Sequence, residues 1–245
     1  MKAMLFAAGL GTRLKPLTDH KPKALVEADG TPLLGHALAL LESHGCTSVV
    51  VNVHHFADQI EKYLAAYNTD MHIAISDERD HLLETGGGLL HARPHLDGDE
   101  PFLVYNTDIV TDLDLGAFYR HHLDRDALAT LAVRQRDTSR YFLYDDAMVL
   151  HGWAHLGERR FKVRRLPETE LRAWAFSGIH VVSPRLFDLF EERGKFSITD
   201  TYLRLCATER ILGYPHDESA WYDAGKPETL AAASEYLHFK SRPPR

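Results

Sequence analysis

Short apolar segments alternate with helical patterns in the first half of the chain. Runs rich in apolar and β-branched residues predict buried strands at residues 2–8, 47–53, 72–76 and 101–105. Between these runs, apolar residues recur at helical spacing, which predicts helices at residues 32–44, 57–67 and 86–92. Strands that alternate with helices imply an α/β fold with a mostly parallel sheet, and ligands of such sheets collect at the carboxyl ends of the strands.

The second half of the chain has a more mixed pattern. Extended segments are predicted at residues 127–134, 159–165, 174–182 and 211–216, with a hairpin or meander at 141–153. Helices are predicted at residues 184–192, 201–209 and 227–239, and the tail at 241–245 is expected to fray. Because no repeat or polar linker interrupts this pattern, we expect a single domain over residues 1–240.

Composition and charge exclude several classes of protein. Hydrophobic residues make up 44% of the 245 positions, enough to bury both faces of a central sheet. The 35 acidic residues outnumber the 28 basic ones, so the chain lacks the positive field of a nucleic-acid-binding protein. No apolar run approaches the ~20 residues that span a bilayer, so no membrane partner is expected. Cys46 and Cys206 lie far apart without zinc spacing, which predicts a reduced, cytoplasmic protein.

A glycine-rich loop follows the first predicted strand. Gly9 and Gly11 allow backbone amides to turn toward an anion, and Arg13 adds a planar fork that grips phosphate oxygens. Lys23 supplies a second positive group ten residues later. The spacing matches neither a P-loop nor a dinucleotide fingerprint. A tight turn with exposed basic residues is the alternative, but Arg13 and Lys23 together favour a phosphate site.

The phrases GLGTRLKPLT at residues 9–18 and KPKALV at 21–26 resemble the signature of the sugar-1-phosphate nucleotidyltransferases. This resemblance implies a Rossmann-like core of the glycosyltransferase-A type, a mostly parallel mixed sheet flanked by helices. It implies a nucleotide-binding half at residues 1–125 and a sugar-binding half at 126–240. It also implies that the loop surrounds the triphosphate through Ala8, Gly9, Gly11 and Thr12, that Arg13 stabilises the transition state, and that Lys23 contacts phosphate.

Two aspartates are candidate metal ligands. Asp108 follows an apolar strand, where a carboxylate faces the ligand cleft, and Asp223 lies in a turn before the last predicted helix. Two carboxylates, with phosphate oxygens and water, make a normal octahedral Mg²⁺ site. Either residue alone could instead cap a helix or form a turn. The resemblance favours metal binding, because the family carries one aspartate after a strand and another in a Trp-x-Asp-x-Gly phrase. Asp112 and Asp114 are expected to be solvated or capping residues.

The phrase Leu-Glu-Thr-Gly-Gly-Gly at residues 83–88 looks like the family's turn that reads the nucleobase. It is most similar to uridylyltransferases that act on N-acetylmuramic acid 1-phosphate, and it is near the mannose-1-phosphate guanylyltransferases. The resemblance implies nucleotide contacts from Gly87, Gly88 and Asn106, with UTP as the favoured donor. A flexible loop is the weaker alternative.

A glycine in a strand marks the expected sugar site. Phe176-Ser177-Gly178 resembles the family's sugar-facing strand, in which the glycine leaves space for a hexose, although a core strand with a bulge is nearly as good an interpretation. Many relatives carry Glu-Lys-Pro upstream, with the lysine on the sugar phosphate. This chain has Arg164-Arg165-Leu166-Pro167, so Arg165 is the expected substitute for that lysine, with a different hydrogen-bonding geometry.

The residues and the resemblance together predict an enzyme that joins a nucleoside monophosphate to a sugar 1-phosphate and releases pyrophosphate. The favoured pair is UTP and an N-acetylmuramate-like sugar 1-phosphate, with Mg²⁺ as cofactor and a place in nucleotide-sugar biosynthesis and cell-wall recycling. Alternatives within the fold are a mannose-1-phosphate or molybdopterin-type guanylyltransferase and a phosphocholine cytidylyltransferase. A nucleotide-sensing regulatory subunit is the alternative outside the enzymes. The base, the sugar and the oligomeric state cannot be inferred from the sequence.

Overall fold

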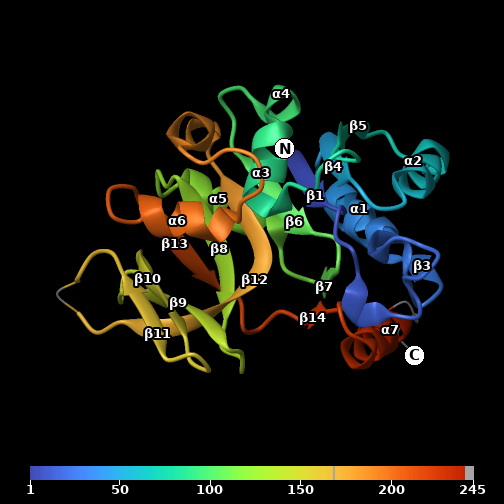
Figure 1. Cartoon of the computed structure of the whole chain (residues 1–245). Coiled ribbons are helices and arrows are strands. Elements are labelled where there is room, and N and C mark those ends of the chain that lie inside the picture. The colour runs from blue at the N-terminus through green and yellow to red at the C-terminus, as the bar shows by residue number, and fades with distance from the viewer. Residues whose placement is uncertain (168, 241–245) are drawn as a thin grey trace.

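A computed structural model describes residues 1–167 and 169–240 (Figure 1). The predicted tail at 241–245 lies outside the described residues. Four parallel strands form the first part of the main sheet, and they confirm the parallel core predicted from the sequence. β1 (Lys2–Phe6) lies between β4 (Ser48–Val53) and β6 (Phe102–Asn106), and β5 (His72–Asp77) pairs with β4 at the edge.

The second part of the sheet is mostly antiparallel and forms around one long strand. β12 (Arg172–Val182) pairs antiparallel with β6, β8 (Ala129–Arg134) and β9 (Arg140–Tyr144). β10 (Leu150–His155) and β11 (Arg160–Val163) extend the sheet beyond β9, and β13 (Ile211–Pro215) pairs parallel with β8. The described residues therefore form one mixed ten-stranded sheet.

Helices cover both faces of this sheet (Figure 1). Alternate side chains of a strand point to opposite faces, and in β1 Ala3 and Leu5 enter one core cluster while Met4 enters the other. The first cluster is closed by α1 (Leu33–Ser43), α2 (Ala57–Ala66) and α5 (Leu115–Leu123). The second is closed by α3 (Glu84–His91), α4 (Arg93–Leu96) and α6 (Ile198–Leu205). No helix in the described part of the chain is long and apolar enough to cross a membrane.

A third, smaller core cluster places the loop after β1 beside the end of the chain. Leu14 from this loop packs with Ala224, Leu230 and Ala233. Ala224 follows the short strand β14 (Trp221–Asp223), which pairs with β7 (Ile109–Thr111), and the other two residues belong to α7 (Pro227–Lys240). The hairpin of β2 (Glu27–Ala28) and β3 (Thr31–Pro32) packs against the same helix. Segments more than 200 residues apart in the chain thus meet at one site.

Several elements differ from the sequence prediction. The expected helix at 184–192 is the 3-10 helix η3 (Pro184–Leu189), and α6 begins at Ile198 instead of residue 201. The Ser197 side chain accepts a hydrogen bond from Thr199 N and caps α6, which fixes this earlier start. Helix α5 was not predicted, and Asp114 caps it by accepting a hydrogen bond from Ala117 N, as the capping hypothesis for Asp114 expected.

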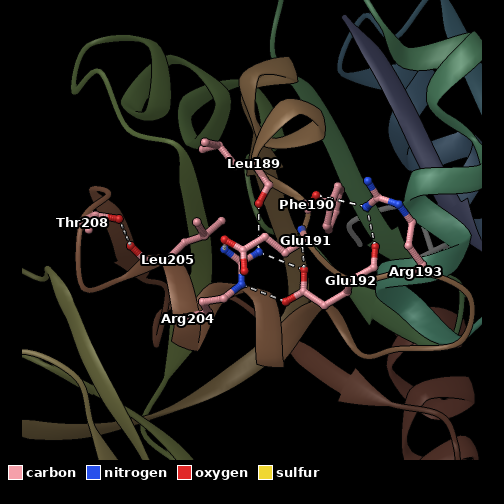
Figure 2. Close-up of polar contacts among 8 residues, drawn as sticks. All are labelled: Leu189, Phe190, Glu191, Glu192, Arg193, Arg204, Leu205 and Thr208. Atoms are coloured by element: carbon pink, nitrogen blue, oxygen red, sulfur yellow. Dashed lines mark hydrogen bonds and ion pairs between the residues drawn. The ribbon is translucent and has the colours of Figure 1, made fainter.

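An arginine on α6 holds the segment that leads into the helix (Figure 2). Arg204 Nε and Nη2 donate to the two carboxylate oxygens of Glu192 at 3.0 and 2.9 Å, and Nη2 also donates to Leu189 O at 2.9 Å. Such a planar fork fixes both distance and orientation. It therefore anchors the chain between η3 and α6, including Ser197, which lines two cavities.

Candidate active site

The glycine-rich loop leaves β1 and folds back toward Lys23. Gly11 has φ +67°, and a side chain there would lie 2.8 Å from Thr18 Cγ2 and 3.0 Å from Lys23 Cβ. The Thr18 hydroxyl donates to Gly11 O at 2.9 Å. Both the positive φ and the close contacts require glycine at position 11. The loop conformation therefore brings the 3-10 turn Thr12–Leu14, with Arg13, close to the 3-10 turn Lys23–Leu25.

Three of the predicted charged groups converge at Gly225. A methyl group built on Gly225 would lie 2.7 Å from Arg13 Nη2, 2.7 Å from Asp223 Oδ1 and 2.9 Å from Lys23 Nζ. Asp223 Oδ1 also accepts a hydrogen bond from Gly225 N at 2.9 Å. The glycine in Trp-Tyr-Asp-Ala-Gly thus leaves space for two cations and one carboxylate to lie side by side.

Asp108 joins this group through Lys23 and through the sheet. Lys23 Nζ forms an ion pair with Asp108 Oδ2, and both side chains are largely buried. Ala224 N donates to Asp108 O at 2.8 Å, and the β7–β14 register sets Asp223 opposite Ile109, the residue that follows Asp108. The structure therefore brings together Arg13, Lys23, Asp108 and Asp223, four residues that are far apart in sequence.

The donor set around Asp108 and Asp223 fits a magnesium ion. Carboxylate oxygens are ligands that Mg²⁺ prefers, and proteins usually supply only one or two of them beside substrate phosphates and water. Consistent with such an open site, the described residues hold no cluster of three or more His, Cys, Asp or Glu side chains arranged for a metal. The positive charges of Lys23 and Arg13 next to the aspartates suit a phosphate-bearing ligand that would share the ion.

A cavity of about 390 Å³ opens beside these residues. Its lining comes from the end of β1, the start of the 3-10 turn Lys23–Leu25, Asn52 on β4, the end of β6 and the start of α3, with Ser197 at one side. Of the predicted site residues, Ala8, Gly9, Lys23, Asn106 and Asp108 line it. Gly11 and Thr12 belong to the same loop but lie outside this lining. The position agrees with the rule that ligands bind at the carboxyl ends of parallel strands.

Gly87 and Gly88 are buried inside α3 and are not among the cavity-lining residues. A side chain on Gly87 would collide with Gly194 O, and one on Gly88 would lie 2.6 Å from Glu78 Oε1. These glycines let α3 approach its neighbours closely, which brings Leu82 and the first two helical residues, Glu84 and Thr85, to the cavity wall. A nucleobase contact from Gly87 and Gly88 themselves stays a prediction.

A buried polar pair, which the sequence analysis missed, supports the cavity floor. Asn52 Oδ1 accepts hydrogen bonds from Ala7 N at 2.7 Å and Ala8 N at 3.3 Å. Asn52 Nδ2 donates to Glu78 Oε1 at 2.6 Å, and Glu78 Oε2 accepts from Leu83 N at 3.1 Å. The pair of Asn52 and Glu78 links the glycine-rich loop to the residues just before α3. The signal in the sequence is a lone amide inside the apolar run Val49–Val53, where an unpaired polar group would be costly.

Gly178 lies against Asn106, one of the residues that line the cavity. It has φ +78°, and a side chain there would lie 2.8 Å from Asn106 Nδ2 and 3.2 Å from Ile109 Cγ1. The β8–β12 register shifts between Phe176 and His180, so the bulge interpretation of this strand is confirmed. Gly178 thus gives room to the Asn106 side chain, and a sugar contact from Gly178 stays a prediction.

Arg165 lies apart from the four converging residues. It lines a separate cavity with Asp145, His151 and Leu166, and its carbonyl lies 2.9 Å from His151 Nδ1. The meander of β9, β10 and β11 determines this position, and linear spacing from Gly178 could not show it. The predicted sugar-phosphate contact of Arg165 has no support from this geometry.

The chain belongs to the Nucleotidyl transferase family, because the sequence model of that family matches residues 2–239. The chain is similar to N-acetylmuramate alpha-1-phosphate uridylyltransferases of Caulobacter vibrioides, with 35% identity over 96% of both chains, and of Neisseria meningitidis, with 32% identity over 92% of this chain and 93% of the relative. It is also 28% identical to the mannose-1-phosphate guanylyltransferase catalytic subunit beta of Dictyostelium discoideum, over 100% of this chain and 67% of the relative.

A solved structure supports the fold. The chain superposes on HddC from Yersinia pseudotuberculosis complexed with GMP-PN with a TM-score of 0.77 and 21% identity, covering 96% of this chain and 99% of that one. The family match and the two uridylyltransferases confirm the predicted class, a sugar-1-phosphate nucleotidyltransferase and hence an enzyme, and the solved structure confirms a mixed sheet with a parallel core flanked by helices.

Proposed function

We propose that this protein transfers the uridylyl group of UTP to N-acetylmuramate 1-phosphate, with release of pyrophosphate and with Mg²⁺ as cofactor. The observation that carries this proposal is the convergence of Arg13, Lys23, Asp108 and Asp223 beside the cavity. The choice of UTP and of the muramate sugar rests on the two uridylyltransferases that align along nearly the whole chain.

The reaction joins two phosphates and needs no general base. An oxygen of the sugar 1-phosphate, already ionised, attacks the α-phosphorus of UTP, and the bond to the β-phosphate oxygen breaks in line with it. The protein then has two tasks, to align the reactants and to neutralise the charge that develops on the leaving pyrophosphate. Arg13 and the amides of the Gly9–Gly11 segment serve the pyrophosphate side.

Asp108 and Asp223 would hold Mg²⁺, which would act as a Lewis acid on the phosphate oxygens. Lys23, paired with Asp108 in this structure, would turn its ammonium toward a phosphate once nucleotide enters the cavity. Asn52 fixes the amides of Ala7 and Ala8, so that the loop is organised before the substrate arrives.

Pyrophosphate release from purified protein tests the proposal. We expect the highest rate with UTP and N-acetylmuramate 1-phosphate when four nucleoside triphosphates are compared across a panel of sugar 1-phosphates. EDTA should abolish the reaction, and Asp223→Asn should remove most of it at ordinary Mg²⁺ concentration, because one of two carboxylate ligands loses its charge.

A preference for GTP and mannose 1-phosphate would replace this proposal by the second candidate, the guanylyltransferase to which the chain is 28% identical. Turnover in EDTA would contradict the metal assignment. Nucleotide binding without turnover on any acceptor would support a sensing module instead.

A further inference from the structure

A second cavity, of about 400 Å³, lies between the antiparallel part of the sheet and the start of α6. It shares Ser197 with the first cavity, so the two lie next to each other. Its wall contains three cationic side chains and several aromatic ones, and its other members are hydroxyl-bearing or apolar except for one carboxylate, Asp200. The cationic residues are Arg136, Arg140 and Lys162.

Strand register explains how these cations reach one face. Phe142 on β9 pairs with Trp153 on β10, which in turn pairs with Lys162 on β11. Directly paired residues of antiparallel strands point to the same face, and Arg140 lies two residues from Phe142 on that face. Lys162 Nζ lies 5.9 Å from the centre of the Trp153 ring. The sheet thus presents an aromatic surface with a cation at either side.

Arg136 lies between this cavity and the four converging residues. Its guanidinium lies 4.8 Å from the centre of the Trp221 ring, and Trp221 is two residues before Asp223. Nη2 donates to Phe176 O at 3.2 Å, whereas the buried Nε has no hydrogen-bond partner. Burial lowers the pKa of Arg136, and the nearby Asp223 opposes that shift. A half-buried guanidinium with an unused donor is a position where an oxyanion would be favourable.

In the described part of the chain, no carboxylate pairs directly with the three cations that line this cavity. Within the described residues, Arg136, Arg140 and Lys162 have neither a hydrogen bond nor an ion pair from their side chains to a carboxylate. Asp200, at the opposite wall, is exposed and also lacks an ion pair there. Three cations against one carboxylate leave an excess of positive charge, in a protein whose net charge is −7.

We propose that this second cavity binds an oxyanion of the sugar 1-phosphate acceptor, and that Arg136 is the residue that holds it. The inference rests on the proposed function, and it identifies a contact that the sequence had attributed to Arg165. The nucleotide loop lies at the first cavity, so an acceptor that reaches Asp223 enters from the side of Trp221 and Arg136. The oxyanion is either the phosphate of the acceptor or a carboxylate on its sugar.

A comparison of two acceptor substrates shows whether the cavity holds the phosphate or the sugar carboxylate. N-acetylmuramate 1-phosphate and N-acetylglucosamine 1-phosphate differ by the lactyl ether, and therefore by one carboxylate. Arg136→Gln removes the charge, and we expect the KM for N-acetylmuramate 1-phosphate to rise by about 10- to 100-fold, as for loss of a charged hydrogen bond. The KM for UTP should stay within about twofold, since the nucleotide site is not altered.

If the cavity holds the sugar carboxylate, the rise is confined to the muramate acceptor and its advantage over the other acceptor disappears. If the cavity holds the phosphate, KM rises equally for both. Lys162→Gln, on a half-exposed edge of the sheet, removes a second cation of the cavity and leaves the packing of Arg136 on Trp221 intact. Arg164→Gln is the matched control, an exposed arginine on the same segment that lines neither cavity.

Unchanged acceptor KM values in both Arg136→Gln and Lys162→Gln would overturn the inference, as would a rise in Arg165→Gln alone. Absence of turnover in the unaltered protein would instead count against the proposed function. In that case calorimetric titration with N-acetylmuramate 1-phosphate still tests whether the second cavity binds the acceptor. Binding that is lost in Arg136→Gln and kept in Arg164→Gln supports the inference. Equal binding by both variants contradicts it.

Discussion

At the residue scale, Arg13 has the clearest assignment to one step of the reaction. It is exposed on its loop, yet its Nη2 atom lies within reach of Gly225, where Lys23 and Asp223 also meet. Of these groups, Arg13 has neither a hydrogen bond nor an ion pair to a carboxylate within the described residues. An arginine guanidinium that no carboxylate occupies can bind an anion that forms only during the reaction, such as the leaving pyrophosphate.

We therefore expect Arg13→Ala to lower kcat by about 10²–10³, as for loss of one preorganised charge contact. The Kd for UTP should change much less, since the charge develops as pyrophosphate leaves. Arg13→Lys should restore only part of kcat, because a point charge cannot form the bidentate fork. Steady-state kinetics and calorimetry measure the two effects separately.

Lys15→Ala is the matched control for the loss of a positive charge from this loop. Lys15 is an exposed cation of the same loop, and its ammonium forms an ion pair with Asp19. It should leave kcat unchanged. A normal kcat in Arg13→Ala would contradict the mechanism whatever happened to UTP binding.

At the scale of elements, the start of α3 controls the shape of the first cavity. Gly86 and Gly87 N both donate to Phe196 O, at 2.9 and 3.3 Å, and Phe196 N donates to Leu83 O at 3.1 Å. Glycine allows the helix to approach this segment without a clash. The contact fixes the turn that lines the first cavity and also places Ser197 between the two cavities.

Gly87→Ala should push α3 away from the segment that contains Gly194 and Phe196, because the added methyl would collide with Gly194 O. Overpacking of this kind typically costs about 1–3 kcal/mol. In a protein of this size we expect a fall in Tm of about 2–4 °C per kcal/mol. Thermal unfolding followed by circular dichroism measures the change.

Gly157→Ala provides the comparison. Its methyl would meet only His155 at 3.4 Å, an ordinary contact, so its Tm should not fall. Equal Tm values for both variants would show that α3 adjusts freely, and the packing role of Gly87 would then be wrong.

At the scale of the whole molecule, three buried histidines connect stability to pH. Burial lowers the pKa of His122 to about 4, of His180 to about 3 and of His216 to about 4. His122 Nδ1 lies 2.9 Å from Thr130 Oγ1, His180 Nδ1 lies 2.5 Å from Tyr202 Oη, and His216 Nε2 lies 2.7 Å from Ser177 Oγ. All three are therefore mostly neutral in the folded protein at about pH 5 and above.

The unfolded chain takes up these protons near pH 6.5, the ordinary value for histidine, while the folded protein does not. The free energy of unfolding should therefore be highest above pH 6.5 and fall as pH decreases toward 4. Each histidine contributes a slope of about 1.4 kcal/mol per pH unit within that window. Denaturant unfolding at pH 7.5, 6.5 and 5.5 measures the slope.

His216→Gln keeps a group that can bond to Ser177 but does not titrate, so it should reduce the slope. A free energy of unfolding that is flat from pH 6.5 to 5.5 would contradict the prediction.

The local patterns of the sequence were enough to predict the parallel core of the fold and, through the motif resemblance, the class of this protein. Apolar periodicity predicted the parallel strands β1, β4, β5 and β6 and the helices α1, α2 and α3, because burial on one face or two imposes a local pattern. The loop from Gly9 to Thr18 indicated a phosphate site, because such a turn needs glycines and cations that are adjacent in the chain. Both features are local, and a linear sequence records them directly.

Tertiary structure decided which distant groups meet. The pairing of β14 with β7 brings Asp223 beside Asp108, and the Asn52–Glu78 pair depends on the neighbouring ends of β4 and β5. The meander of β9 to β11 separates Arg165 from these groups and leaves Arg136 next to Trp221. The physical reason is that strand order and register, which arise from packing of the whole sheet, decide which side chains share a face, and spacing along the chain does not contain that information.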